Sequence, residues 1–393
     1  MSIDVQAVRR ETRGVRNVTH LNHAGSSLVS RPVAETVVGH LRREEEIGGY
    51  EAAEEAADRL EDVYSSVARL LGAQPNEIAL AESGSRAWGA AVYSLPFASG
   101  TRLLIGRTEY SGNVIALRQL ARRHGLKIVV LRDDPHGQVD VGHLQRELER
   151  GNVAMVALTH VPMANGLVNP ATQVGRLCRA AGVLFVVDAC QSVGQMPLDV
   201  ESLGCDVLAG TGRKFLRGPR GTAFLYVRAS VLEQLEPVML DGHSAAPSGA
   251  NGFEMRGDAR RFESWEASVA GRLGLGRAVD YALALGLDAV QERVAWLAEL
   301  LRNALSAVPA ITVHDGGVTR CGIVTFSVRG SDAGTIRAKL AHHRINVSVA
   351  PLPPSEVNAV LTGKPDAAAT VVRASVHYYN TEAEIQRLVS LLG

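Results

Sequence analysis

Several residue types and patterns are scarce in this 393-residue chain, and each scarcity excludes a class of protein. It has four cysteines without C-x-x-C spacing, so neither a disulfide framework nor a metal site is expected. No run of about 18 apolar residues occurs, and the first residues lack the apolar stretch of a signal peptide. Acidic and basic residues balance at 41 each, whereas proteins that bind nucleic acid or anionic membranes usually carry a basic excess. We therefore expect a cytoplasmic protein with no nucleic-acid or membrane partner.

Lysine is also rare. Only four of the 41 basic residues are lysines: Lys127, Lys214, Lys339 and Lys364. A GC-rich genome is the simplest explanation for the excess of arginine. Three of the lysines occupy positions typical of a surface, at the start of a strand, on a helix and in a polar loop. Chemistry that requires a lysine amine therefore points to Lys214.

Short apolar runs alternate with amphipathic segments between residues 60 and 230. Runs that are apolar on both faces predict strands over residues 102–106, 127–131, 153–161, 183–189 and 222–227. Helical patterns that end at glycine lie between them, over residues 112–125, 141–151 and 170–182. This alternation predicts an α/β fold with an open, mostly parallel sheet. Ligands of such sheets bind at the carboxyl ends of the strands.

The remaining third of the chain has a different pattern. Residues 230–258 are rich in Gly, Ser and Asp and are expected to be irregular, and a long helical segment follows over 268–308. Strand and helix patterns then alternate to the end, where Thr381 and Glu384 form a capping box for the last helix. This part predicts a smaller α+β domain.

Two polar features follow strands at the expected ligand-binding edge. Asp188 ends the strand run at 183–189, a position that suits a helix or turn cap as well as a ligand-binding carboxylate. The Ser-Gly-Ser stretch at 83–85 turns into a helix after a strand at 77–81. Such stretches are common in helix caps, and they also bind anions through unpaired N–H groups.

Lys214 is the third feature, in a glycine-rich loop that follows a predicted strand at 206–210 and also contains Arg213, Arg217 and Arg220. A basic loop of this kind is consistent with simple binding of a phosphate or an acidic partner. The more specific hypothesis is a Schiff-base lysine, whose amine is nucleophilic when it is partly desolvated and surrounded by cations. Together, an amine, a carboxylate and an anion site are the three groups that pyridoxal phosphate needs.

With these motifs the chain resembles the class V aminotransferase family of fold type I pyridoxal-phosphate enzymes, which includes cysteine desulfurases and isopenicillin N epimerases. The similar segments run from LNHAG at 21–25 to RASVH at 373–377, and the segments around Lys214 and Asp188 are the most specific. The resemblance implies an N-terminal segment (1–20), a large cofactor-binding domain with a mostly parallel seven-stranded sheet (21–258), and a small α+β domain (259–393). It also implies a homodimer.

The resemblance further implies roles for individual residues. Lys214 would be the catalytic residue, binding pyridoxal phosphate as a Schiff base and moving the Cα proton of the substrate. Asp188 would pair with the pyridinium nitrogen, Gln191 would hydrogen-bond the phenolic oxygen, and Tyr110 would stack on the ring. The phosphate would be bound by Ser85, Arg86, Thr211 and Arg213.

An amino-acid substrate would contact Asn22, His23 and Arg373. Arg373 would bind the α-carboxylate of this substrate. Two positions depart from the family pattern. Met163 occupies a position that is usually Asn, for which Asn165 is an alternative. Trp265 lies in FESWE, which replaces an F-E-x-G-T pattern that reaches the phosphate of the neighbouring subunit, and either a pocket wall or interface packing fits an aromatic residue there.

The expected reaction follows from what the family motifs retain and lose. The stretch 351–368 lacks the cysteine that accepts sulfur in cysteine desulfurases, and Cys321 has the surroundings of a core residue, so a persulfide mechanism is disfavoured. Four segments, IGGYEAA at 47–53, HVPMANGLV at 160–168, GRKFLRGPRG at 212–221 and FESWEAS at 262–268, resemble those of the lyase and epimerase branch, which includes hercynylcysteine sulfoxide lyase-like and lincosamide-pathway enzymes.

We therefore expect a C–S β-lyase that converts an S-substituted cysteine to a thiol, pyruvate and ammonia, in sulfur or secondary metabolism such as antibiotic biosynthesis. An aminotransferase, an amino-acid epimerase, a decarboxylating oxidative deaminase and a binding module without activity are the alternatives.

Overall fold

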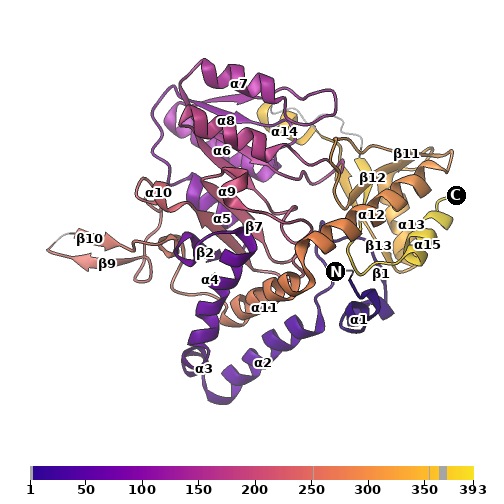
Figure 1. Cartoon of the computed structure of the whole chain (residues 1–393), viewed down its shortest axis with the longest axis horizontal. Helices are drawn as coiled ribbons and strands as arrows, with labels where there is room; N and C mark the ends of the chain where they lie inside the picture. The colour runs from indigo at the N-terminus through magenta and orange to yellow at the C-terminus, as the bar shows by residue number, and fades with distance from the viewer. Residues whose placement is uncertain (1–2, 251, 354, 363–369) are drawn as a thin grey trace.

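The computed structural model describes residues 3–250, 252–353, 355–362 and 370–393 (Figure 1). Its large sheet consists, in spatial order, of β2 (Ile78–Ala81), β8 (Ala223–Val227), β7 (Val207–Thr211), β6 (Leu184–Asp188), β5 (Val153–Thr159), β3 (Arg102–Ile105) and β4 (Lys127–Val130). The strands from β7 to β4 pair in parallel, and β8 is antiparallel to both of its neighbours. The mostly parallel sheet of seven strands is thus confirmed within the described ranges.

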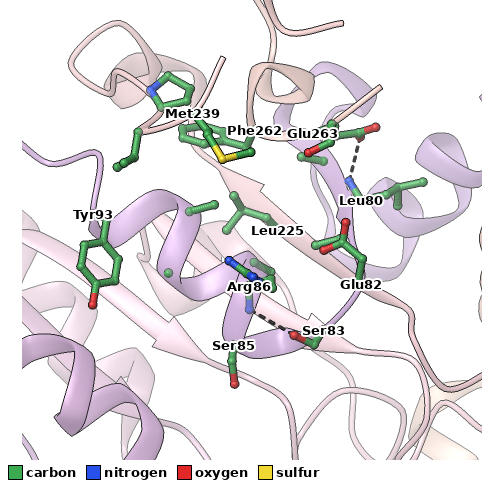
Figure 2. Close-up of a pocket in the computed structure, with 18 residues that line it drawn as sticks. Leu80, Glu82, Ser83, Ser85, Arg86, Tyr93, Leu225, Met239, Phe262 and Glu263 are labelled. Atoms are coloured by element: carbon green, nitrogen blue, oxygen red, sulfur yellow. Dashed lines mark hydrogen bonds between the residues drawn. The ribbon is translucent and has the colours of Figure 1, made fainter. Parts of the chain in front are cut away.

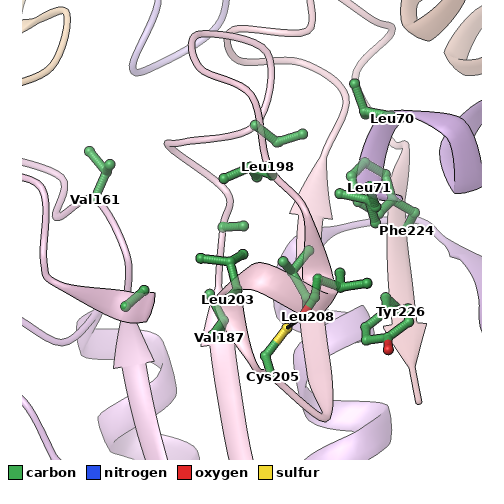
Figure 3. Packing of buried hydrophobic residues seen from close by; sticks show 14 of the residues in the cluster. Leu70, Leu71, Val161, Val187, Leu198, Leu203, Cys205, Leu208, Phe224 and Tyr226 are labelled. Atoms are coloured by element: carbon green, nitrogen blue, oxygen red, sulfur yellow. Dashed lines mark hydrogen bonds between the residues drawn. The ribbon is translucent and has the colours of Figure 1, made fainter. Parts of the chain in front are cut away.

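Both faces of this sheet are apolar because helices cover each of them. Val187 of β6 belongs to one hydrophobic core, and the preceding Val186 belongs to the other. Figure 3 shows the first core, where Leu71 lies beside Phe224 of β8. The first core includes residues of α4 (Ala57–Leu71), α7 (Val141–Glu149), α8 (Ala171–Ala181) and α9 (Val200–Leu203), and the second includes residues of α5 (Gly84–Val92) and α6 (Ser111–His124).

The predicted glycine stops of two sheet-covering helices are confirmed. Helix α6 ends at Gly125 with φ of 67°, and α8 ends at Gly182 with φ of 64°. Glycine adopts this left-handed conformation without a steric penalty, which lets the chain turn from the helix into the next strand. The local sequence therefore determines where these two helices end.

Two stretches differ from the sequence-based expectation. Within residues 230–258, the structure contains a β-hairpin of β9 (Ala245–Ser248) and β10 (Gly252–Met255), which projects from the body at the left of Figure 1. The helical segment expected over 268–308 is two helices, α11 (Val269–Leu285) and α12 (Leu287–Ser306). They are separate because Gly286, with φ of 81°, interrupts the helical backbone.

The C-terminal part forms a second, antiparallel sheet. Its strands are, in spatial order, β11 (Ile311–Val313), β12 (Ile323–Val328), β15 (Thr370–Ser375) and β14 (Ser348–Pro351). Helices α12, α13 (Ala333–His342) and α15 (Glu382–Ser390) pack with it, whereas α14 (Ser355–Thr362) packs against α6, where Val357 joins the second core of the large sheet. The capping box of Thr381 and Glu384 is present at the start of α15, as predicted.

The remaining elements lie near the N-terminus and in connections. They are α1 (Val5–Arg10), β1 (Thr19–His20), α2 (Arg31–Ile47), α3 (Gly49–Glu55), α10 (Ala229–Leu232), β13 (Ile345–Asn346) and the short 3-10 helices Arg13–Arg16, Pro75–Glu77 and Ala259–Phe262. Strand β1 pairs in parallel with β13, and Val8 and Leu21 join the core of the C-terminal part. Side chains of α11, such as Leu275, pack into a core of the large sheet. The domain boundaries at 20/21 and 258/259 stay predictions.

None of the helices in the described ranges combines the length and the apolar character needed to cross a membrane.

Candidate active site

A cavity of about 400 Å³ lies where β5, β6 and β7 end, at the carboxyl edge of the large sheet. This is the edge at which ligands of open α/β sheets bind. Eight of the residues predicted from the sequence line it together: Ser85, Tyr110, Asp188, Gln191, Thr211, Arg213, Lys214 and Arg373. The fold thus brings residues from distant parts of the chain into one site.

Lys214 lies in the loop after β7, where backbone hydrogen bonds close a tight turn. The N–H of Arg217 donates to the carbonyl of Lys214 at 3.0 Å, and the N–H of Gly218 donates to that of Gly212 at 2.7 Å. Burial lowers the pKa of the Lys214 amine, and the positive charge of Arg213 lowers it further. A lowered pKa leaves more of the amine neutral, and only the neutral amine is a nucleophile.

Asp188 ends β6 and is 6% exposed. One carboxylate oxygen, Oδ1, accepts a hydrogen bond from the backbone N–H of Cys190 at 2.9 Å. The other, Oδ2, accepts one from the side-chain amide of Asn113 at 2.9 Å. Asp188 therefore stabilises the turn after β6, as the capping alternative proposed, and it also lines the cavity.

Gln191 carries an unsatisfied polar atom on the cavity wall. Its Nε2 donates to the carbonyl of Ala24 at 3.1 Å, while its Oε1 is buried without a hydrogen-bond partner. Buried polar atoms of native proteins are almost always paired, so an unpaired one beside a cavity indicates a missing polar ligand atom. Because the same wall carries Lys214 and Asp188, the residues present fit pyridoxal phosphate.

The start of α5 and the end of β7, for which the sequence predicts an anion site, both reach the cavity. Ser83 caps α5 by accepting a hydrogen bond from the N–H of Arg86 at 3.3 Å, and Ser85 lines the cavity in the first turn. Thr211 and Arg213 lie opposite, and the Arg213 guanidinium donates to the carbonyl of Gly25. The side chain of Arg86 points into a neighbouring cavity (Figure 2). Only the backbone of Arg86 therefore belongs to the helix start beside the Lys214 cavity.

Arg373 is held at the cavity by two described hydrogen bonds. Its Nε donates to Oγ of Ser348 at 2.9 Å, and a terminal nitrogen donates to the carbonyl of Met163 at 2.9 Å. Met163 itself lines the cavity. Asn165, the alternative for the missing family asparagine, has φ of 64° and is not among the lining residues.

Among the described residues, Ala24 and Gly25 line the cavity, and the predicted Asn22 and His23 do not. His23 is fully buried, and its ring lies within hydrogen-bond distance of Ser27 Oγ, at 2.9 Å, and Asn380 Oδ1, at 3.1 Å. Burial and the neighbouring His20 and His377 hold its pKa well below the usual value. His23 thus packs behind the segment that reaches the site.

A buried network was not predicted from the sequence. Glu109 precedes α6, and its Oε1 accepts hydrogen bonds from the Asn113 amide at 2.9 Å and from the Thr159 hydroxyl at 2.6 Å. Burial, with a smaller contribution from the charge of Asp188, raises the pKa of Glu109 to about 7. The i, i+4 spacing of Glu109 and Asn113 is the only sequence signal for this contact, and it is common.

Comparison with known proteins agrees with this geometry. The family model for class-V aminotransferases matches residues 19–388. A probable cysteine desulfurase of Methanothermobacter thermautotrophicus is 28% identical over 97% of this chain and 95% of its own length. The cysteine desulfurase of Dickeya dadantii is 31% identical over 75% of this chain and 70% of its own length.

Two solved structures illustrate the similarity of fold. The apo cysteine desulfurase of Thermococcus onnurineus NA1 has a TM-score of 0.90 at 24% identity, covering 100% of this chain and 97% of that one. The cystine C–S lyase C-DES, in complex with its product cysteine persulfide, has a TM-score of 0.83 at 23% identity, covering 97% and 98%. These structures establish the fold, and the family model spans nearly the whole chain. The chain therefore belongs to the class-V aminotransferase family and is a pyridoxal-phosphate-dependent enzyme.

Proposed function

We propose that the protein is a C–S β-lyase that acts on an S-substituted cysteine. The observation that carries this proposal is the composition of one cavity: Lys214, Asp188 and Arg373 line it together, and the half-buried Cys190 beside them has a thiol whose pKa is raised by desolvation and by the charge of Asp188. The first three residues suit removal of a Cα proton from an amino acid. The state of the thiol does not suit it to accept sulfur.

The proposed cofactor site uses groups that the structure places on the cavity wall. When bound, pyridoxal phosphate supplies an electrophilic aldehyde and a ring that withdraws electrons from the substrate's Cα. Lys214 would hold the aldehyde, Asp188 would hold the ring nitrogen, and Gln191 would hydrogen-bond a polar group of the ring through its unpaired oxygen. Ser85, Thr211 and Arg213 would hold the phosphate.

The chain's own residues would then orient the substrate and move its proton. Arg373 would bind the α-carboxylate, because a guanidinium offers two parallel N–H donors to a carboxylate. Lys214 would remove the Cα proton, and the Cβ–S bond would break with the electron pair leaving on sulfur. Overall, the substrate and one water would give the thiol, pyruvate and ammonia.

Transfer of sulfur to a cysteine of this chain is not supported. Burial raises the pKa of Cys190 well above its ordinary value, and the negative charge of Asp188 raises it further. Cys321 is 3% exposed and belongs to the core. The stretch 351–368 contains no cysteine, and its residues 354 and 363–368 lie outside the described part of the chain.

The proposal is tested by incubating purified holoenzyme with cysteine conjugates that carry different S-substituents. We expect pyruvate and the free thiol without any added keto acid, and no product from Lys214→Ala, which should also lack the visible absorption band of the bound cofactor. Strict dependence on a keto acid would identify an aminotransferase. Recovery of the opposite enantiomer or release of CO₂ would identify an epimerase or a decarboxylating enzyme, and each result contradicts the lyase.

We also propose that two copies of this chain form a dimer beside the active site. Ser83 and Ser85 line both the Lys214 cavity and a second cavity of about 760 Å³ (Figure 2). Val238 and Met239 belong to the wall of the second cavity but are 72% and 77% exposed, and Trp265, which follows the lining residue Ser264 and whose backbone N–H donates to Asp241, is 66% exposed. Large apolar side chains exposed together in this way are typical of a protein interface.

Light scattering of the purified protein tests the dimer. We expect a dimeric mass for the wild type and a monomeric mass for Met239→Asp, because a carboxylate in an apolar interface loses its hydration. The control is Val318→Asp, which changes a residue of similar exposure, 71%, that does not line the cavity of Figure 2. A monomeric wild type, or equal effects of the two variants, would contradict the proposal.

A further inference from the structure

One side-chain amide lies between two buried carboxyl groups next to the active site. Nδ2 of Asn113 donates at 2.9 Å to Oε1 of Glu109 and at 2.9 Å to Oδ2 of Asp188. The exposed fractions of Asn113, Glu109 and Asp188 are 2%, 4% and 6%. Asn113 is not among the residues that line the Lys214 cavity, so any effect on a ligand there passes through another residue.

The orientation of this amide is fixed by its surroundings. If the oxygen and nitrogen of the Asn113 side chain exchanged places, a carbonyl oxygen would face both carboxyl groups, and Oδ2 of Asp188 would lose the amide N–H that it accepts. In the observed orientation each N–H of the amide has its own acceptor. The amide therefore offsets repulsion between two acidic groups in a region with little water.

Each carboxyl group is also held by one residue from a different element. Asp188 Oδ1 accepts from the N–H of Cys190 after β6, and Glu109 Oε2 accepts from the N–H of Thr159 at the end of β5, at 2.7 Å. Asn113, in the first turn of α6, is thus connected to the end of β6 through Asp188 and to the end of β5 through Glu109. Without its amide, Asp188 Oδ2 would lose its described donor, and the side chain of Asp188 would be held by contacts with Cys190, through its backbone N–H and its thiol.

We propose that Asn113 is a positioning residue for Asp188: its amide fixes the orientation of the Asp188 carboxylate toward the cavity and separates it from Glu109. This inference rests on the proposed role of Asp188 in holding the ring nitrogen of the cofactor. It does not depend on which reaction follows. Asn113 would therefore act on cofactor binding and leave the choice of substrate unchanged.

The experiment measures the affinity of the apoenzyme for pyridoxal phosphate through the visible absorption band, in wild type and Asn113→Ala. A hydrogen bond to a charged group contributes about 1.5–3 kcal/mol, so we expect affinity to fall about tenfold or more. Asn169→Ala is the matched control, because Asn169 is equally buried, at 2%, and bonds the carbonyl of Thr159 rather than Asp188. We expect less than a twofold change in its affinity.

A double-mutant cycle separates positioning from a general loss of structure. In an Asp188→Asn background, Asn113→Ala should change cofactor affinity less than twofold, because the carboxylate that it positions is gone. The charged or titratable groups that act on Asp188 from other elements are Glu109, Cys190 and Lys214, and they are the same in both backgrounds. An undiminished effect of Asn113→Ala in this background would overturn the proposal.

The absorption band of the cofactor gives a second readout. Because Asp188 is proposed to hold the ring nitrogen, the band maximum of cofactor-saturated Asn113→Ala should shift in the same direction as that of Asp188→Asn, whereas that of Asn169→Ala should match the wild type. A purely structural defect would lower the melting temperature and weaken binding without moving the band, and would overturn the proposal. Lyase activity is measured separately. A wild type that binds the cofactor but releases no thiol contradicts the proposed function. The role of Asn113 is then still decided by cofactor affinity in the double-mutant cycle.

Discussion

Burial sets the protonation of individual residues around this cavity, and it acts in opposite directions on acids and bases. It lowers the pKa of Lys214 and raises the pKa of Glu109 to about 7, in each case because an ion is poorly solvated there. The lowered value favours the neutral amine that the proposed chemistry needs. The raised value gives the enzyme a carboxyl group that titrates near neutral pH.

Glu109 therefore predicts a pH dependence of stability. Because its pKa is about 7 in the folded enzyme against an ordinary value of 4.5, its contribution is full below about pH 4.5 and is lost as the pH rises through 7. We expect the melting temperature of the wild type to fall over this range, and to fall less in Glu109→Gln, which cannot titrate. Melting curves between about pH 5 and 8 measure this. Parallel pH profiles for the two proteins would show that another group is responsible.

Helix α5 begins so close to the turn after β6 that its first residue has no room for a side chain. A Cβ on Gly84 would lie 2.3 Å from Sγ of Cys190, far inside van der Waals contact. This approach brings the start of α5 to the cavity beside Asp188. The start of α5 and Asp188, which we propose bind the phosphate and the ring nitrogen of the cofactor, are thus positioned by the packing of one helix start against one strand end.

This packing predicts a defect and its rescue. Gly84→Ala should push α5 and Cys190 apart and weaken binding of pyridoxal phosphate, by about tenfold for a misplaced loop that loses one charge-assisted hydrogen bond. Adding Cys190→Ala removes the sulfur and should restore most of the affinity. Titration of the three apoenzymes with the cofactor measures this. If the double variant binds as poorly as Gly84→Ala, the contact is not the cause.

At the scale of the whole molecule, Arg217 joins three parts of the chain behind the lysine loop. It is 2% exposed, and its guanidinium donates to Oγ1 of Thr12 at 2.7 Å, to the carbonyl of Leu28 at 2.9 Å and to the Tyr378 hydroxyl at 2.8 Å. The same group lies 4.4 Å from the centre of the Tyr379 ring. The N-terminal segment and the C-terminal part are therefore both attached to the loop that carries Lys214.

Arg217→Met is expected to destabilise the protein by about 3 kcal/mol, because it removes the guanidinium donor from three polar groups, those of Thr12, Leu28 and Tyr378. Arg217→Lys should also be destabilising, since an ammonium group cannot reproduce the planar set of donors. Arg123→Met, at an exposed position of α6, is the control and should have little effect. Chemical denaturation measures the free energies of unfolding. Similar values for Arg217→Met and Arg123→Met would show that the junction is not stabilising.

Much of the fold was predictable from the sequence because its signals are local. Strands that are buried on both faces must be apolar throughout, and helices that turn back onto a sheet end at glycine, so residues 102–227 could be assigned without tertiary information. The hairpin of β9 and β10 was missed because its exposed residues carry no apolar pattern. The break at Gly286 was missed because one glycine inside a helical pattern does not show whether the helix continues.

The sequence by itself determined the kind of chemistry: four lysines, one of them in a glycine-rich loop after a strand, left little choice for the amine, and the residue types around it indicated the cofactor. Only the tertiary structure decided which residues meet. It placed Asn113 between Glu109 and Asp188, brought Met163 to Arg373, and buried His23 behind the site. These contacts join residues far apart in the chain, and no local propensity encodes them, because burial and hydrogen bonding arise from the packing of all the elements together.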